Sequence, residues 1–300
     1  MAKKKKTFIF TDIDLDGGMS YLLFKWFRGY DVPHISCNVT SFNNTFKGWI
    51  KRVNPDTYDQ IYILDLDISK DSAELVDRDN VVIIDHHDTH VANKGKYKRA
   101  KPFIKHKTSC CKLIYELLHK KSVCKLTDDQ KLLMLMADDY DCYNLQIPGS
   151  HELNTLYWNY QGNRVDKFAN DFNKGFNKFT DDQQKIIAFY KKKVQAVIRD
   201  TEVYEATIPI KGIPTRFVSA FASAHINDVA HHIINNNNAD VGIVTNLKSN
   251  KVSFRKSRTS DIDLSKLAMN LANGGGHTSA SGGTLTKTFM TFSRLFQPIK

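Results

Sequence analysis

The sequence predicts an α/β protein in which an N-terminal domain, built on a parallel sheet with a helical covering segment, precedes a smaller α/β domain. Three observations lead to this fold class. Short apolar runs at residues 7–11, 61–64 and 81–84 end in acidic or imidazole side chains and alternate with helix-like segments, which is typical of a parallel sheet. The pattern between residues 108 and 203 is helical. Short strand-like runs then follow residue 203.

The length of 300 residues is about twice that of a typical domain, so two domains are expected. We place the first at residues 1–190 and the second at residues 205–300. Residues 191–204 join them, beginning as the end of an amphipathic helix.

The bulk composition indicates a protein that attracts polyanions. The net charge of +11 favours nucleic acid as a partner. The five cysteines include no C-x-x-C pair, which argues against a disulfide framework and against a thiolate zinc site. No apolar run approaches the roughly 20 residues of a membrane span, and the first apolar run is too short for a signal peptide. We therefore expect a cytoplasmic protein with no membrane partner.

The expected elements of the first domain alternate between strand and helix. Residues 7–11 form a strand and residues 19–30 a helix. Residues 61–69 form a second strand that ends in acids, residues 70–79 a helix, and residues 81–90 a third strand that ends in acid and imidazole. Because the carboxyl ends of parallel strands gather at one edge of a sheet, the three polar clusters should converge there.

Helices are expected next, with short strands and turns after them. The helices lie at residues 110–120, at residues 126–141 with Thr127 as the cap, and at residues 181–199. The second domain should contain strands at residues 203–210, 215–221, 239–247 and 251–255, a helix at residues 228–234 and a glycine-rich segment at residues 272–285.

The first acidic motif, DIDLDGG, places Asp12, Asp14 and Asp16 directly after a strand. An extended backbone aims alternate side chains to the same side, so the three carboxylates would repel one another. A divalent cation relieves that repulsion, and hard oxygen ligands suit Mg²⁺ or Mn²⁺. The alternative is a solvated acidic turn that caps the following helix.

The next two strands add carboxylates and imidazoles. Asp65 and Asp67 follow the second strand, and Asp85, His86 and His87 follow the third. Carboxylates with one or two imidazoles favour Mn²⁺, and two cations could share one carboxylate. A centre of two metal ions suits hydrolysis of a phosphoester, because it activates water and clamps the phosphoryl group.

A fourth acidic cluster lies in the helical region. The segment MADDYD contains Asp138, Asp139 and Asp141, one of which could complete the metal site. The alternative is a polar helix end.

The C-terminal part of the sequence offers groups that bind phosphate. His277 lies in a glycine-rich segment, where the backbone N–H groups around Gly275 and Gly276 can cradle an anion. Arg255 lies at a strand end, and a guanidinium can make two hydrogen bonds to one phosphate. These residues predict a substrate clamp, with a tight turn and a solvated strand edge as the alternative.

Basic and aromatic residues suggest further contacts with nucleic acid. Residues 94–101 contain five cations in eight positions, which favours sequence-blind contacts with phosphates. Tyr97, Tyr157, Trp158 and Tyr160 could stack on single-stranded bases, although core packing is the stronger interpretation.

With these motifs in place, the chain resembles a DHH-family phosphoesterase over nearly its whole length. The motif that names the family is present as Asp85, His86 and His87, and the GGGH mark of the associated C-terminal domain is present at residues 274–277. The DIDLDGG motif is closer to that of RecJ-type exonucleases. The length is that of the nanoRNase and pAp-phosphatase group.

The resemblance implies roles for individual residues. Asp14, Asp16 and His86 would bind metal, Asp65 would bridge two ions, and His87 would contact a metal or the scissile phosphate. In the fourth motif it favours Asp139, with Asp138 nearly as good and Asp141 as a further alternative. The substrate's terminal phosphate or nucleotide would be held by Arg255, Gly275, Gly276 and His277.

One departure from the family concerns the first metal position. Members commonly have a histidine four residues before the position of Asp14, and this chain has Phe10 there. Asp12 is the obvious replacement ligand.

The expected function is a Mn²⁺-dependent exonuclease or oligonucleotidase with two metal ions, Mg²⁺ being the alternative ion. It would cut single-stranded DNA or RNA, or short oligonucleotides, from an end, with the 5′ end as the family expectation. One alternative is hydrolysis of a small nucleotide such as a cyclic or linear dinucleotide or pAp. Another, motivated by Phe10, is a catalytically silent nucleic-acid-binding module. Monomer and homodimer are both compatible with the sequence, and the compact form suits a bacterial or phage protein.

Overall fold

The computed structural model describes residues 5–87, 90–91, 94–119, 125–276 and 278–299. The chain divides into two compact units, Met1–Ile187 and Ala188–Lys300, here called unit 1 and unit 2. The division falls inside the long helix α9 (Asp181–Arg199). The catalytic and substrate-binding roles of the two units remain predictions.

Unit 1 is built on a parallel sheet with the strand order β2-β1-β3-β4-β5. Thr11 at the end of β1 pairs with Leu64 at the end of β3, and Leu64 pairs with Ile84 in β4. The carboxyl ends of three neighbouring strands therefore finish at the same level. The strands are β1 (Thr7–Thr11), β2 (His34–Ser36), β3 (Gln60–Leu64), β4 (Val81–Asp85) and β5 (Lys101–Ile104).

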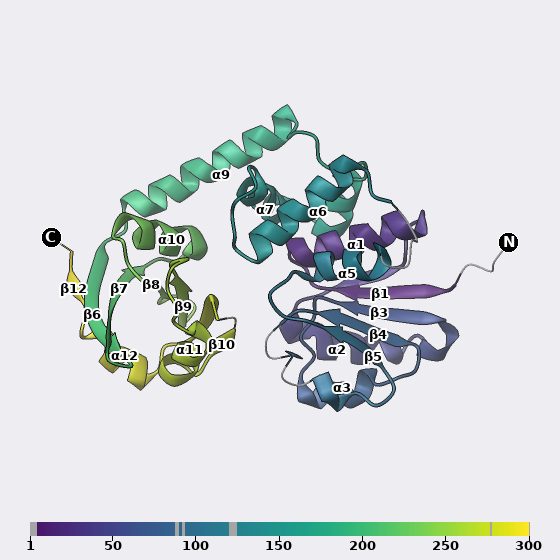
Figure 1. The fold of residues 1–300 in the computed structure, drawn as a ribbon, viewed down its shortest axis with the longest axis horizontal. Helices are drawn as coiled ribbons and strands as arrows, with labels where there is room; N and C mark the ends of the chain where they lie inside the picture. The colour runs from purple at the N-terminus through teal and green to yellow at the C-terminus, as the bar shows by residue number, and fades with distance from the viewer. Residues whose placement is uncertain (1–4, 88–89, 92–93, 120–124, 277, 300) are drawn as a thin grey trace. The chain divides into compact units, whose positions relative to one another are not determined.

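Helices cover both faces of this sheet and enclose two hydrophobic cores (Figure 1). One face carries α1 (Leu15–Arg28), α5 (Cys110–His119), α6 (Asp128–Asp141), α7 (Ser150–Asn159) and α8 (Arg164–Asp171). The other carries α2 (Val39–Ile50) and α3 (Lys70–Val76), while short 3₁₀ turns η1 and η2 lie at Pro55–Thr57 and Lys94–Lys96.

Phe10 belongs to the core on the α2 face of the sheet. Its ring is fully buried, and its centroid lies 5.9 Å from that of Phe42, 5.2 Å from that of Phe46 and 5.2 Å from that of Trp49. The position where the resembling family has a histidine is therefore an aromatic packing position in this chain.

Unit 2 contains a seven-stranded sheet with the order β10-β11-β9-β8-β7-β6-β12, in which only β7 and β8 pair in parallel among the described strands. Helix α10 packs on one face, and α11 and α12 pack on the other. The strands are β6 (Val203–Ile210), β7 (Ile213–Phe221), β8 (Val241–Asn246), β9 (Lys251–Lys256), β10 (Gly275–Gly276), β11 (Ala280–Thr284) and β12 (Gln297–Pro298), and the helices are α10 (Ile226–Asn236), α11 (Leu264–Ala272) and α12 (Lys287–Ser293).

The expected α/β architecture is confirmed, with local differences from the sequence prediction. Helix α1 begins at Leu15 rather than at Met19, because the side chain of Asp14 accepts a hydrogen bond from the N–H of Gly17 and caps the helix. The elements that were not individually predicted include strands β2 and β5 and helices α2, α7, α8, α11 and α12. No helix in the described part of the chain is both long and apolar enough to cross a membrane.

Candidate metal centre

The polar clusters that follow β1, β3 and β4 converge, as the sequence predicts. Asp12 and Asp65 directly follow β1 and β3, and Asp85 is the last residue of β4. The aligned ends of these adjacent strands bring the three residues to one edge of the sheet. This is the edge at which open α/β sheets bind their ligands.

His86 lies at the centre of the cluster. Its Nε2 atom is 3.1 Å from Oδ1 of Asp65, 3.6 Å from Oδ2 of Asp16 and 3.6 Å from Oδ2 of Asp141. Asp16 and Asp65 are almost fully buried, and the side chain of His86 is 10% exposed. The structure therefore collects carboxylates from three separate segments around one imidazole.

The acidic loop after β1 also anchors two helices. Asp14 caps α1 through the N–H of Gly17, at 2.9 Å. The carboxylate of Asp16 accepts hydrogen bonds from the N–H groups of Cys110 and Cys111, at 2.6 and 2.8 Å, at the beginning of α5. Asp16 therefore serves as an anchor for the N-terminus of α5 while it lies within the cluster.

The two glycines of the DIDLDGG motif allow the loop to pack closely. A Cβ atom at Gly18 would lie 2.7 Å from the ring of Tyr157, and one at Gly17 would overlap the backbone of Asp12. The hydroxyl of Tyr157 donates to the carbonyl of Ile13 at 3.0 Å. The loop is thus held against α7, which fixes the direction of its carboxylates.

In the fourth acidic cluster Asp141, and not the favoured Asp139, is the residue with a carboxylate oxygen 3.6 Å from Nε2 of His86. Asp139 accepts hydrogen bonds from the N–H groups of Gln146 and Ile147, at 2.9 and 3.0 Å, and from the hydroxyl of Ser150 at 2.7 Å. It holds the segment between α6 and α7, which occupies both of its oxygens.

Asp138, the other alternative, also has a structural role. Its carboxylate accepts hydrogen bonds from the N–H and the hydroxyl of Ser109, at 3.2 and 2.8 Å, and from Nζ of Lys112 at 2.8 Å. Asp141 is consequently the member of the cluster that lies beside His86.

Asp85 binds two imidazoles at once. Its Oδ1 atom is 2.8 Å from Nδ1 of His87, and its Oδ2 atom is 2.6 Å from Nδ1 of His90. Asp67 lies farther away, with Oδ1 at 3.9 Å from Nδ1 of His90. Asp85 is therefore an orienting group for histidines and does not face His86 as Asp65 does.

The imidazoles of this site hold protons tightly in the absence of a cation. Burial alone would lower the pKa of His86, but the surrounding carboxylates, led by Asp141 and Asp16, raise it to about 9. Burial also opposes the protonated form of His87, but the charge of Asp85 and its hydrogen bond raise the pKa of His87 to about 9.

The carboxylates show the same excess of negative charge. Burial, followed by the charge of Asp14, raises the pKa of Asp12 to about 7. Burial raises the pKa of Asp141 to about 8, although the charge of His86 opposes it. Burial likewise raises the pKa values of Asp16 and Asp65. Protons neutralise this site when no other cation does so.

The donor atoms suit a divalent cation. Asp65 Oδ1 and Asp141 Oδ2 are buried and have no hydrogen-bond partner among the described residues. Each faces Nε2 of His86, and carboxylate oxygen with imidazole nitrogen is a ligand set of divalent metals. Because buried carboxylate oxygens are costly to leave unpaired, these two atoms have the chemistry expected of metal ligands.

In unit 2 the structure brings most of the predicted clamp onto neighbouring strands. Arg255 in β9 pairs with Ala280 in β11, and Gly276 in β10 pairs with Ser281, which is also in β11. Nη2 of Arg255 is 2.5 Å from Oδ1 of Asn227. Gly275 and Gly276 are exposed. His277 lies outside the described residues, so its role stays a prediction.

The predicted nucleic-acid contacts divide between solvent and core. Tyr157 is fully buried and Tyr160 nearly so, whereas Trp158 is 43% exposed, with the guanidinium of Arg164 4.9 Å from its ring centroid. In the basic run at residues 94–101, Arg99 pairs with Asp79 at 2.5 Å. Core packing therefore applies to Tyr157 and Tyr160.

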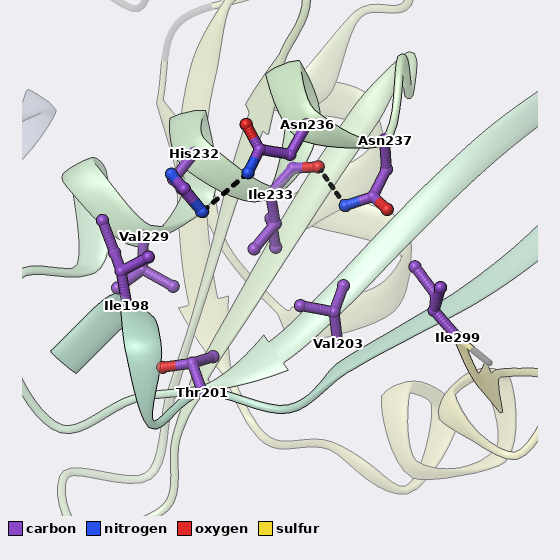
Figure 2. A pocket seen from close by; sticks show the side chains of 9 residues that line it. All are labelled: Ile198, Thr201, Val203, Val229, His232, Ile233, Asn236, Asn237 and Ile299. Carbon is purple, nitrogen blue, oxygen red and sulfur yellow. Dashed lines mark hydrogen bonds between the residues drawn. The ribbon is translucent and has the colours of Figure 1, made fainter. Parts of the chain in front are cut away.

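A pocket of about 320 Å³ lies within unit 2, where α10 approaches β6 and the end of α9 (Figure 2). Nδ2 of Asn236 lies 2.9 Å from Nε2 of His232, and Asn237 donates to the carbonyl of Ile233. The lining of this pocket includes no lysine or arginine that could bind a phosphate by charge. The lining residues are Ile198, Thr201, Val203, Val229, His232, Ile233, Asn236, Asn237 and Ile299.

Comparisons with known proteins concern the family and the fold of the chain. Residues 6–138 match the model described as DHH family, N-terminal domain. No curated protein sequence matches the chain. The pGpG-specific phosphodiesterase PggH from Vibrio cholerae is 13% identical, with a TM-score of 0.57 over 97% of this chain and 96% of that one.

Two structures of RecJ share the fold as well. Exonuclease RecJ bound to manganese is 12% identical, with a TM-score of 0.53 over 97% of this chain and 88% of that one. RecJ in complex with Mn²⁺ from Thermus thermophilus is 12% identical, with a TM-score of 0.55 over 99% of this chain and 53% of that one. The family match covers β1, β3 and β4 with the acidic and histidine residues at their ends, so residues 6–138 carry the N-terminal domain that is typical of the DHH family.

Proposed function

We propose that the protein is a Mn²⁺-dependent phosphodiesterase that hydrolyses single-stranded nucleic acid or short oligonucleotides from an end. The observation that carries this proposal is the cluster around His86, in which Asp65 and Asp141 each present a buried oxygen without a hydrogen-bond partner among the described residues. Such atoms require a cation or a proton. A divalent cation between carboxylates and imidazole is the usual centre for phosphoester hydrolysis.

The ligands would come from the strand ends and from α6. Asp12 and Asp14 lie on the loop after β1, and Asp16 lies in the first turn of α1. Asp65 lies where it could bridge two ions, and Asp141 would replace Asp139 as the ligand of the fourth motif. When bound, the cations supply Lewis acidity that polarises the phosphoryl group and lowers the pKa of the attacking water. Mn²⁺ is favoured over Mg²⁺ because imidazole is among the ligands.

The residues of the chain would orient the substrate and the proton transfers. Asp85 binds Nδ1 of His87, so this ring presents Nε2 to the scissile phosphate or to a metal. Asp16 is held by the N-terminus of α5, which keeps its carboxylate fixed in the cluster. Preorganised groups of this kind stabilise developing charge without reorganising during the reaction.

The substrate class rests on charge and on the predicted clamp. The net charge of +11 favours a polyanion. Arg255 and the exposed backbone of Gly275 and Gly276 are suited to a terminal phosphate. RecJ, whose fold this chain shares, is an exonuclease bound to manganese, which supports an end-specific reaction. A start at the 5′ end is what the family resemblance implies.

A second candidate is hydrolysis of a small nucleotide such as a linear dinucleotide. The similarity to the pGpG-specific phosphodiesterase PggH, which covers 96% of that chain, favours it. Both candidates use the same metal centre and differ in the length of the substrate.

The test is digestion by the full chain with Mn²⁺ of single-stranded DNA and RNA, labelled at the 5′ or the 3′ end, from dinucleotides to strands of about 30 nucleotides. Asp65→Asn is the control, because asparagine tolerates the positive φ of 57° at this position and removes only the charge. We expect stepwise shortening from the 5′ end that Asp65→Asn abolishes. Cleavage of dinucleotides alone would select the second candidate.

Two results would overturn the proposal. One is cleavage that survives Asp65→Asn or metal chelation. The other is binding of single strands without cleavage of any of these substrates, which would indicate a silent binding module.

A further inference from the structure

A second histidine is buried next to the metal centre. His90 is fully buried, and its Nδ1 atom lies 2.6 Å from Oδ2 of Asp85, the oxygen that does not bind His87. The N–H of His90 also bonds to the carbonyl of His87 at 3.0 Å, and both rings contact one carboxylate. Asp85 is thus held by an imidazole on each of its two oxygens.

The other nitrogen of His90 binds a tyrosine. Nε2 of His90 lies 2.6 Å from the hydroxyl of Tyr97, which the chain brings back after η2. Burial, followed by the charges of Asp67 and Asp85, raises the pKa of Tyr97, so the phenol keeps its proton. Tyr97 can therefore act as the hydrogen-bond donor to His90.

The hydrogen bonds of Tyr97, His90, Asp85 and His87 form a connected series. If the hydroxyl of Tyr97 is the donor to Nε2 of His90, a neutral imidazole at His90 carries its proton on Nδ1. That Nδ1–H donates to one oxygen of Asp85, and Nδ1–H of His87 donates to the other. In this order Nδ1 of His87 bonds to Asp85, and Nε2 is the other nitrogen of the ring.

Asp67, Asp85 and His90 together have the composition of a metal site. In this structure Nδ1 of His90 and Oδ2 of Asp85 are 2.6 Å apart, which is a direct hydrogen-bond distance. Lys96, which donates to the carbonyl of Ile68, lies close enough to Asp67 to supply positive charge on this side.

We propose that Tyr97 and His90 are positioning residues that act through Asp85 to set the tautomer and the orientation of His87. The proposal rests on the proposed function, because the hydrogen bonds that link Tyr97, His90 and Asp85 would orient His87 so that its Nε2 faces a phosphate or a metal. Carboxylates and their partners behind a functional histidine commonly control its orientation, and their loss costs about tenfold to a hundredfold in activity or metal affinity.

The first experiment measures the tautomers directly. Nitrogen-15 spectra of the histidine side chains in the metal-free full chain, recorded above the pKa of about 9 of His87 so that its ring is neutral, should show protons on Nδ1 of His87 and of His90, and Tyr97→Phe should weaken the signature at His90. A proton on Nε2 of neutral His90 in the wild type would overturn the proposal. Since this measurement needs no turnover, it is independent of whether the proposed function is correct.

The second experiment measures kinetics. Tyr97→Phe removes only a hydroxyl, and Tyr62→Phe is the matched control, because the hydroxyl of Tyr62 in unit 1 bonds to Gln60 and lies outside the chain of hydrogen bonds. We expect Tyr97→Phe to lower kcat about tenfold with an unchanged KM, and Tyr62→Phe to leave kcat unchanged. Equal kcat values for the two variants would overturn the proposal.

Substitutions of His90 guard against a misfolded variant. His90→Asn can still donate to Asp85, whereas His90→Ala cannot. We expect His90→Asn to keep more activity than His90→Ala at equal folded fraction, as judged by thermal melting. Equal losses would contradict a positioning role. A wild-type protein without any hydrolysis would refute the proposed function instead, and the spectra would still decide the tautomers.

Discussion

Nε2 of His86 lies 3.1 Å from Oδ1 of Asp65, although the two residues follow different strands. Asp65 reaches this place in the left-handed region, with a φ of 57°, while its N–H remains bonded to the carbonyl of Ile84 at 2.9 Å. A non-glycine residue in this region stores strain, and such positions concentrate at functional sites. The backbone is therefore turned at the end of β3 to place a carboxylate against an imidazole.

The charge of this site predicts how stability depends on pH without metal. The pKa values of Asp12, Asp141 and His86 are raised to about 7, 8 and 9, so the folded protein binds protons more tightly than the unfolded chain does. Stability from these groups is present at low pH and is lost as the pH rises through those values. We expect the melting temperature of metal-free protein to fall by about 5 °C between about pH 6 and about pH 8.5.

Metal should reverse that trend, because a divalent cation replaces the protons. The stabilisation by Mn²⁺ should therefore grow over the same pH range. Asp141→Asn, which removes one of the groups, should flatten the slope of the metal-free protein. A melting temperature that rises with pH in the presence of a chelator would contradict this description of the site.

Exchanging single acids of the DDYD segment should separate function from stability. Asp141→Asn should lower kcat by about a hundredfold or more, because it removes a charged ligand, and should leave the fold intact. Asp139→Asn should lower the free energy of unfolding by about 1–3 kcal/mol, because it disturbs the hydrogen bonds to Gln146, Ile147 and Ser150, with kcat near that of wild type. Steady-state kinetics and urea unfolding measure the two effects, and the opposite assignment would restore Asp139 as the ligand.

The strand-end clusters could be predicted from the sequence, whereas the choice among Asp138, Asp139 and Asp141 could not. Side chains alternate between the two faces of a strand, and the carboxyl ends of parallel strands share one edge of the sheet. The position of an acid relative to the end of its strand therefore predicts that it lies at this edge. In a helix, positions 139 and 141 differ by roughly 200° in direction, so the acid that faces the site depends on how α6 packs. That packing is fixed by tertiary contacts of Asp138 and Asp139 with Ser109 and Ser150.

Helix α2 was not predicted from the sequence for a different reason, which is its residue composition. Its segment, VTSFNNTFKGWI, contains β-branched residues, asparagines and a glycine, which have low helix propensity. The apolar spacing of Phe42, Phe46 and Trp49 is nevertheless helical, and these side chains pack around Phe10. That spacing, with Asn38 as the cap, is the signal that could have predicted the helix.

Substitution of Gly18 should show how closely the first turn of α1 packs against Tyr157 of α7. Gly18→Ala places a Cβ atom 2.7 Å from the ring of Tyr157, so it should destabilise the protein by about 1–3 kcal/mol. Gly48→Ala is the matched control, because no atom lies within 4 Å of the added Cβ and the residue is inside α2. It should stabilise by about 0.5–1 kcal/mol. Equal effects in denaturant unfolding would show that this packing yields freely.

Restoring a histidine at position 10 should not create a ligand. Phe10 is surrounded by Phe42, Phe46 and Trp49, so an imidazole there would be buried among aromatic rings without a partner. We expect Phe10→His to lower stability by about 1–3 kcal/mol more than Phe10→Leu and to leave the Mn²⁺ affinity unchanged in calorimetry. A gain in affinity would show that position 10 can reach the metal centre.

Asp16 contacts both the first turn of α5 and His86, so the backbone amides of that turn should respond to the charge at the site. The carboxylate that receives the amide protons of Cys110 and Cys111 is also 3.6 Å from Nε2 of His86, so any cation that draws on its charge must weaken those two amide bonds. Binding of a cation at the centre should therefore change the backbone hydrogen bonds at the start of α5, although α5 itself is not expected to supply a ligand. The chemical shifts and hydrogen-exchange rates of these two amides would report the state of the site even when no substrate is turned over.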